Sequence, residues 1–251
     1  MALDYSVEHK TNLTYSQFNA ALDKFKKTLQ TGDVAVFYFS GFTKQECEKN
    51  YLLPVPDPKS KEEQSISVDV VLEALSRATE SFVFLESRQV PGSFLKNPCG
   101  KDKGLAAIGK LANNQAFAMA SALDKELRAK DSKYSVFTHA LFKNMTEDMM
   151  DFPDLMAATI SDVKAATKNA QIPYWKSNLK APFSFFHPEQ PSKRASDCPR
   201  TGALKEAGAI TSKPFSHKVP FTPAQFRGFL FVDAASCRIL EFVTFCQSRH
   251  P

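Results

Sequence analysis

The chain has 251 residues, enough to bury one sizeable core, and its 43% hydrophobic and 24% charged residues are typical of a globular protein. The net charge is +5, but the 32 Lys and Arg residues alternate with 27 acidic ones and form no basic stripe with aromatic residues, so nucleic-acid binding is not expected. No apolar run is long enough to span a bilayer, and the opening MALDYSVEHK lacks the apolar stretch of a signal peptide, which together predict a cytoplasmic protein that binds no membrane.

The first half of the chain predicts two helices, each followed by a buried strand. Thr14 can cap a helix in which apolar residues recur at helical spacing over residues 18–29. Residues 34–39 are continuously apolar without alternation, which is typical of a buried parallel strand. A second helix is predicted to begin near Ser67, and it leads to another buried strand at residues 82–85.

The following segments continue this alternation. Residues 88–104 carry several Pro and Gly and are predicted to form a loop, whereas the apolar residues 117–122 fit either a strand or a helix. Helices are predicted to begin at Ser135 and at Pro153, and residues 183–185 are predicted to form a last short strand. The pattern indicates an α/β fold in which a mostly parallel sheet carries helices on both faces.

The character of the sequence changes after residue 187. Seven of the 15 prolines lie in residues 188–251, where periodicity is weak until the apolar residues 229–232. We therefore expect a folded domain over residues 1–187 and a Pro-rich, largely irregular extension over residues 188–251.

Short motifs in a fixed order carry a family resemblance, namely Phe39-Ser40-Gly41, Asn50-Tyr51-Leu52-Leu53-Pro54, Phe137-Thr138-His139-Ala140-Leu141, and Thr167, Gln171, Pro173 and Trp175 at matching spacing. This order resembles the caspase/metacaspase clan of cysteine peptidases, above all its metacaspase-like branch, over residues 13–186. The resemblance implies a caspase-like three-layer sandwich.

The same resemblance implies a central strand and helix before Tyr5-Ser6-Val7, which this sequence lacks. A gap in the middle of a sheet leaves backbone groups without partners. We expect either that residues 229–232 enter the gap as a strand, or that the chain is molten and aggregation-prone.

The resemblance also places a catalytic His after Ser-Gly, followed by a Gly that supplies an oxyanion amide, and a catalytic Cys after the second buried strand. Phe42 stands at the His position, Thr43 at the Gly position and Ser87 at the Cys position. Two alignments are open at the strand end: Ser87 replaces the Cys and Arg88 is kept, or one residue is deleted and Glu86 replaces the family's Asp. Phenylalanine cannot accept a proton, and a serine without a base is a poor nucleophile, so no catalytic residue is expected to be functional.

Other residues near the disabled site have two interpretations each. Glu86 is either a remnant of the family's substrate pocket or, as we favour, a strand-end carboxylate in water. Cys47 and Cys99 could approach the cleft, but a free cysteine is more often an inert small apolar residue. His139 is better explained as a partly exposed helix histidine than as a catalytic base.

The five cysteines are odd in number and show no CxxC spacing. This pattern favours free thiols in a reducing compartment over a disulfide framework or a zinc site. We expect no metal and no cofactor.

The leading hypothesis is a non-catalytic caspase-like homologue that binds a protein or peptide partner, such as an active caspase-like relative, through its sheet edge or its disabled cleft. Two alternatives stay open. One is a caspase-family cysteine endopeptidase with an unrecognised nucleophile such as Cys99 or Ser87. The other is a non-functional fragment of a caspase-like gene.

Overall fold

The computed structural model describes residues 7–60, 64–89, 104–121, 135–146, 150–185 and 229–233. Within these ranges the elements are β1 (Glu8–Thr11), α1 (Tyr15–Thr28), β2 (Val34–Glu46), β3 (Lys49–Leu53), β4 (Ile66–Ser67), α2 (Val68–Leu75), β5 (Glu80–Gln89), β6 (Gln115–Met119), α3 (Val136–Thr146), α4 (Phe152–Thr167), β7 (Tyr174–Ser177) and β8 (Phe229–Asp233).

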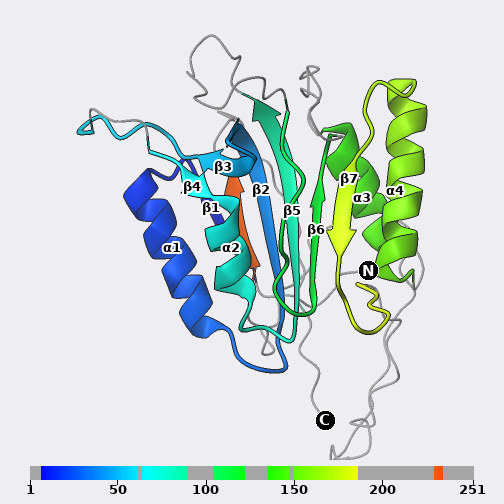
Figure 1. Ribbon diagram of the computed structural model, residues 1–251, viewed down its shortest axis with the longest axis horizontal. Helices are drawn as coiled ribbons and strands as arrows, with labels where there is room; N and C mark the ends of the chain where they lie inside the picture. Colours follow the sequence, from blue (N-terminus) through cyan, green and yellow to red (C-terminus); the bar gives the residue numbers. More distant parts are fainter. Residues whose placement is uncertain are drawn as a thin grey trace, which may run out of the picture.

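These elements form three layers, with a mixed sheet in the middle. The strands follow the order β1-β8-β2-β5-β6-β7, and all neighbours along this path are parallel except β7, which runs antiparallel to β6. Helices α1 and α2 cover one face of the sheet and α3 and α4 the other (Figure 1). The predicted α/β sandwich is therefore confirmed.

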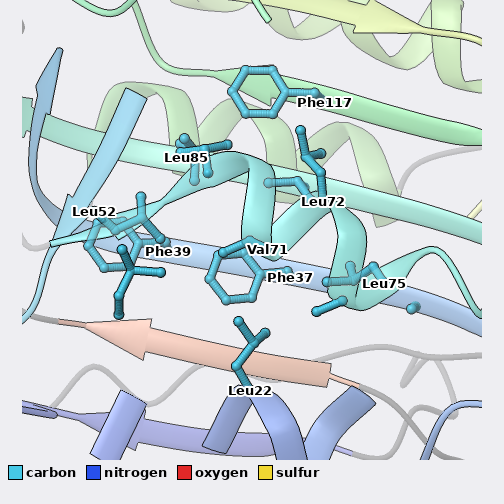
Figure 2. Packing of buried hydrophobic residues seen from close by; sticks show 14 of the residues in the cluster. Leu22, Phe37, Phe39, Leu52, Val71, Leu72, Leu75, Leu85 and Phe117 are labelled. Carbon is cyan, nitrogen blue, oxygen red and sulfur yellow. The ribbon is translucent and has the colours of Figure 1, made fainter. Parts of the chain in front are cut away.

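Alternation along β2 and β5 explains why both faces are buried. Side chains at successive strand positions point to opposite faces. One set packs under α1 and α2, as Figure 2 shows in part, and comprises Ala35, Phe37, Phe39, Val83 and Leu85. The other set packs under α3 and α4 and comprises Val34, Val36, Tyr38, Phe82 and Phe84. A strand whose sequence is continuously apolar therefore indicates a sheet that is covered by helices on both faces.

The helices begin where polar side chains supply hydrogen bonds to the free backbone amides. Thr14 precedes α1, and its backbone N–H donates to Oε1 of Gln17 at 3.0 Å. Ser67 caps α2 by accepting a bond from the N–H of Asp69 at 3.2 Å. The predicted helix starts are confirmed, and of the ambiguous residues 117–122 the first three belong to the strand β6, which begins earlier, at Gln115.

The predicted last strand at residues 183–185 is wrong. Phe183 and Phe185 instead pack on Phe82, with ring centroids 4.5 and 4.7 Å from its own. Two aromatic residues separated by one serine fit a strand pattern, but here both rings fill the core under α3 and α4. The edge of the sheet is formed by the preceding segment, β7.

The motif of Thr167, Gln171 and Trp175 closes this end of the domain. The backbone N–H of Gln171 donates to Oγ1 of Thr167 at 3.1 Å, and its side-chain Nε2 donates to the carbonyl of Ala120 at 2.7 Å. Trp175 then meets Phe152 edge to face, with 5.7 Å between the ring centroids. The motif therefore has a structural role, because it ties the end of α4 to β6 and β7.

Strand β8 occupies the interior of the sheet, between β1 and β2 (orange in Figure 1). It runs parallel to both neighbours, in register with β1 from Glu8 to Thr11 and with β2 from Val36 to Ser40. The expectation that residues 229–232 enter the sheet as a strand is confirmed. How the rest of the predicted extension is organised stays a prediction, because its other residues lie outside the described ranges.

Strand β1 joins the sheet through β8, which is its only strand partner among the described residues. A second link comes from Lys24 of α1, whose Nζ donates to Oε1 of Glu8 at 3.0 Å. Burial raises the pKa of the Glu8 carboxyl, but the hydrogen bonds and charges of Lys24 and Lys10 outweigh it and hold this pKa below its ordinary value.

Candidate functional site

The carboxyl ends of β2 and β5 lie side by side and carry the residues that the sequence analysis singled out. The two strands stay in register throughout, so that Ser40 pairs with Glu86, Gly41 with Ser87 and Thr43 with Gln89. In open parallel sheets this edge is where ligands most often bind.

Phe42 and Ser87 do not face each other. By the alternation set out above, Phe42 lies on the face covered by α3 and α4, and Ser87 lies on the face covered by α1 and α2. Phe42 is 38% exposed, whereas Ser87 is 2% exposed. The structure therefore brings the two strands together without bringing these two side chains together.

Thr43 lies on the same face as Ser87 and is 1% exposed. Among the described residues its hydroxyl has no hydrogen-bond partner. Burying a hydroxyl without a hydrogen bond lowers the free energy of unfolding by about 1–3 kcal/mol, and no polar contact within the described ranges offsets this cost for Thr43.

Glu86 is 6% exposed, and the interpretation as a strand-end carboxylate in water is wrong. Its Oε2 accepts hydrogen bonds from the hydroxyl of Ser135 and from that of Thr138, the latter at 3.3 Å. Alternation explains the burial, because Glu86 follows Phe82 and Phe84 on the face that α3 covers. The carboxylate thus anchors the start of α3 to the end of β5.

Two members of this network were not predicted as site residues. Ser135 was expected only as a helix cap, and it does accept the N–H of Thr138 at 3.0 Å, but it also donates to Glu86. Tyr38 was expected only as a strand residue, and its hydroxyl lies 2.5 Å from Oγ1 of Thr138. The Thr of the Phe-Thr-x-Ala-Leu motif was the sequence signal that could have located the network.

A model of one protein family covers most of the chain. The model described as "Caspase domain" matches residues 1–184. The chain belongs to the caspase domain family. The motif order over residues 13–186 therefore pointed to the correct family.

Two solved caspase structures resemble the fold at low sequence identity. Caspase-1 from Spodoptera frugiperda is 12% identical with a TM-score of 0.48, over 71% of this chain and 73% of that one. The structure of pro-sf-caspase-1 is 15% identical with a TM-score of 0.44, over 68% of this chain and 72% of that one. No curated protein matches the chain significantly.

Neither β2 nor β5 of this caspase domain carries a histidine. The described part of the chain contains two, His9 on the edge strand β1 and His139 on α3, and both are exposed. The interpretation of His139 as an exposed helix histidine is confirmed.

Cys47 corrects the prediction that the cysteines are free, because it is disulfide-bonded. It is the only cysteine in the described ranges, and Cys99 lies outside them. Cys47 and Glu48 form the two-residue turn between β2 and β3 with φ of 50° and 63°, values that residues other than Gly adopt at a cost. An odd number of cysteines in the sequence is therefore compatible with a disulfide.

Beside this turn lies an open groove of about 540 Å³ that the sequence analysis missed. Its walls are the turn at residues 47–50, one side of α2, and the irregular segment 107–112. Asn50 fixes the approach to that segment, since its Oδ1 accepts the N–H of Ala106 and its Nδ2 donates to the carbonyl of the same residue, both at 2.8 Å.

The far side of the segment is fixed as well. Nζ of Lys176 on β7 donates to the carbonyls of Ile108 and Gly109, at 2.9 and 2.6 Å. The groove therefore has a preformed wall without regular secondary structure. Asn50, in the Asn-Tyr-Leu-Leu-Pro motif, was the sequence signal that could have located it.

No group of three or more His, Cys, Asp or Glu side chains among the described residues is arranged to hold a metal ion. In the same ranges, no helix has the length and apolar character needed to cross a membrane.

Proposed function

We propose that this caspase-family chain is a non-catalytic module that binds a protein or peptide partner. The observation that carries the proposal is the placement of Phe42 and Ser87 on opposite faces of the sheet. A nucleophile and its base must lie within hydrogen-bond reach of each other, and Phe42 has no atom that accepts a proton. Ser87 is also buried, which keeps a substrate from its hydroxyl.

The full chain is expected to show no turnover of peptides that contain Arg, Lys or Asp. The substitutions F42H, T43G and S87C together should give a thiol no more reactive than S87C alone, because residues 42 and 87 point to opposite faces. Alkylation rates mapped by mass spectrometry measure this, with F42C as the exposed control that should react readily.

Two results would overturn the non-catalytic assignment. Faster alkylation of the triple variant than of S87C would show that the two positions approach each other. Peptide turnover that disappears in Ser87→Ala or Cys99→Ala would instead identify a peptidase with an unrecognised nucleophile.

The groove beside α2 supports the binding half of the proposal. Hydrogen bonds between the side chains of Asn50 and Lys176 and the backbone of residues 106–109 hold one wall in place, and a preformed wall lowers the ordering cost of binding. The apolar side chains of Leu72, Ile108 and Leu111 contribute to the lining, together with acidic and basic residues at its rim. A short extended peptide with both apolar and polar side chains fits such a lining.

Filling the groove is expected to abolish peptide binding. A Cβ at Gly109 would meet no atom within 4 Å, so this position of the lining has space for a side chain to begin, and Gly109→Trp adds a bulky one there. Peptides selected by display on the full chain should bind this variant at least tenfold more weakly. The matched control is Val70→Trp, at an exposed position of α2 outside the groove lining. Equal losses in both variants would contradict the assignment of the groove.

A further inference from the structure

The slot between β1 and β2 is filled by a strand from a distant part of the sequence. Strand β8 is separated from the preceding described residue, Phe185, by residues 186–228. It nevertheless forms the sheet interior, pairing with four residues of β1 and five of β2.

The slot needs a strand. On its β2 side, Val36, Phe37 and Phe39 are fully buried and Tyr38 is 8% exposed, so the backbone there has no access to water. Buried backbone amides and carbonyls require partners, and a parallel ladder supplies them without regard to which molecule carries the strand. On its other side, β1 has β8 as its only strand partner in the described ranges.

We propose that this slot is an exchangeable strand-binding site, and that residues 229–233 of a second copy of the chain enter it in place of the copy's own β8. The same five residues make the same ladder whether they come from the same molecule or from another. Two chains that exchange this strand reciprocally satisfy both slots and form a closed dimer. The inference does not depend on the proposed partner binding or on the absence of catalysis.

The chain's own β8 competes with the β8 of a second copy for the slot. A tethered segment competes at an effective concentration that reaches the millimolar range for flexible tethers. At micromolar protein the exchanged form is therefore a minor population, and a covalent trap is needed to collect it.

An engineered disulfide between β1 and β8 can serve as this covalent trap. Thr11 of β1 pairs with Asp233 of β8, and Thr11 is exposed. Cα atoms of paired residues on neighbouring strands are about 4.8 Å apart, within the range that a disulfide spans. Two full-length variants with different tags, T11C and D233C, are mixed at about 100 µM under mild oxidation, well below the concentration at which exchange would dominate.

A heterodimer linked through positions 11 and 233 should accumulate, at a rate that rises with protein concentration, and peptide mapping identifies the link among the native cysteines. The double variant T11C/D233C should close within one chain. The off-register control mixes E8C with D233C, whose positions are roughly 10 Å apart along the strands, too far for a disulfide.

Three results would overturn the proposal. The first is no heterodimer from T11C and D233C while the double variant closes internally, which means that β8 does not exchange. The second is equal linking of E8C, which means random collision. The third is a double variant that does not close, which means that β8 does not occupy the slot in this register.

Discussion

Deleting residues 188–251 is expected to abolish cooperative thermal unfolding. The deletion removes β8 from the interior of the sheet and leaves β1 without its strand partner. Each buried backbone group without a hydrogen bond costs about 1–3 kcal/mol, and about half of the five β2 positions that pair with β8 direct their N–H and C=O groups into the slot. Against a typical net stability of about 5–15 kcal/mol, the loss removes most or all of the free energy of unfolding.

Circular dichroism during heating measures this result. The matched control deletes only residues 234–251, which keeps β8, and should melt close to the full chain. If the 188–251 deletion melts cooperatively at the same temperature as the full chain, the sheet does not depend on β8.

Replacing Phe82 by Ala is expected to lower the free energy of unfolding by about 3–5 kcal/mol. Phe82 is fully buried at the centre of the aromatic cluster under α3 and α4. Its ring centroid lies 4.5, 4.7 and 5.4 Å from those of Phe183, Phe185 and Phe152. These three aromatic neighbours belong to two segments, α4 and residues 183–185, and close packing keeps them from collapsing fully into the cavity, so the larger end of this range is expected.

Urea denaturation followed by fluorescence gives the change in the free energy of unfolding. Phe142→Ala is the matched control, since Phe142 is 36% exposed on α3 and its truncation should cost far less. Similar losses in the two variants would contradict the assignment of Phe82 as the centre of the cluster.

The fold was largely predictable because its elements follow local rules. The apolar run at residues 34–39 indicated a doubly covered strand, and β2 packs helices on both faces. Thr14 and Ser67 marked helix starts through capping chemistry that depends on a few neighbouring residues. The entry of residues 229–232 followed from a non-local argument, namely that a sheet interior cannot leave its backbone unpaired.

The site was less predictable because it depends on which face each side chain takes. The motif order aligned Phe42 and Ser87 with a catalytic pair, but the sequence could not show that the register of β2 and β5 directs them apart. Glu86 looked like a solvated strand end because its partner Ser135 lies 49 residues further along the chain. The prediction of a strand over residues 183–185 was wrong for a related reason. A Phe-x-Phe pattern cannot distinguish a segment that pairs with a strand from one whose rings pack on the face of the sheet.

The late position of β8 in the sequence also delays formation of the sheet during synthesis on the ribosome. Strand β1 is made near the start of synthesis and β2 soon after, yet their common neighbour β8 begins only at Phe229. At about 5–20 residues per second, both strands wait roughly ten to forty seconds with open hydrogen-bonding edges. Contacts this distant in sequence also slow folding after release, because a long loop must close before they form. We therefore expect nascent chains of this protein to expose the unpaired edges of β1 and β2 until residues 229–233 have been made.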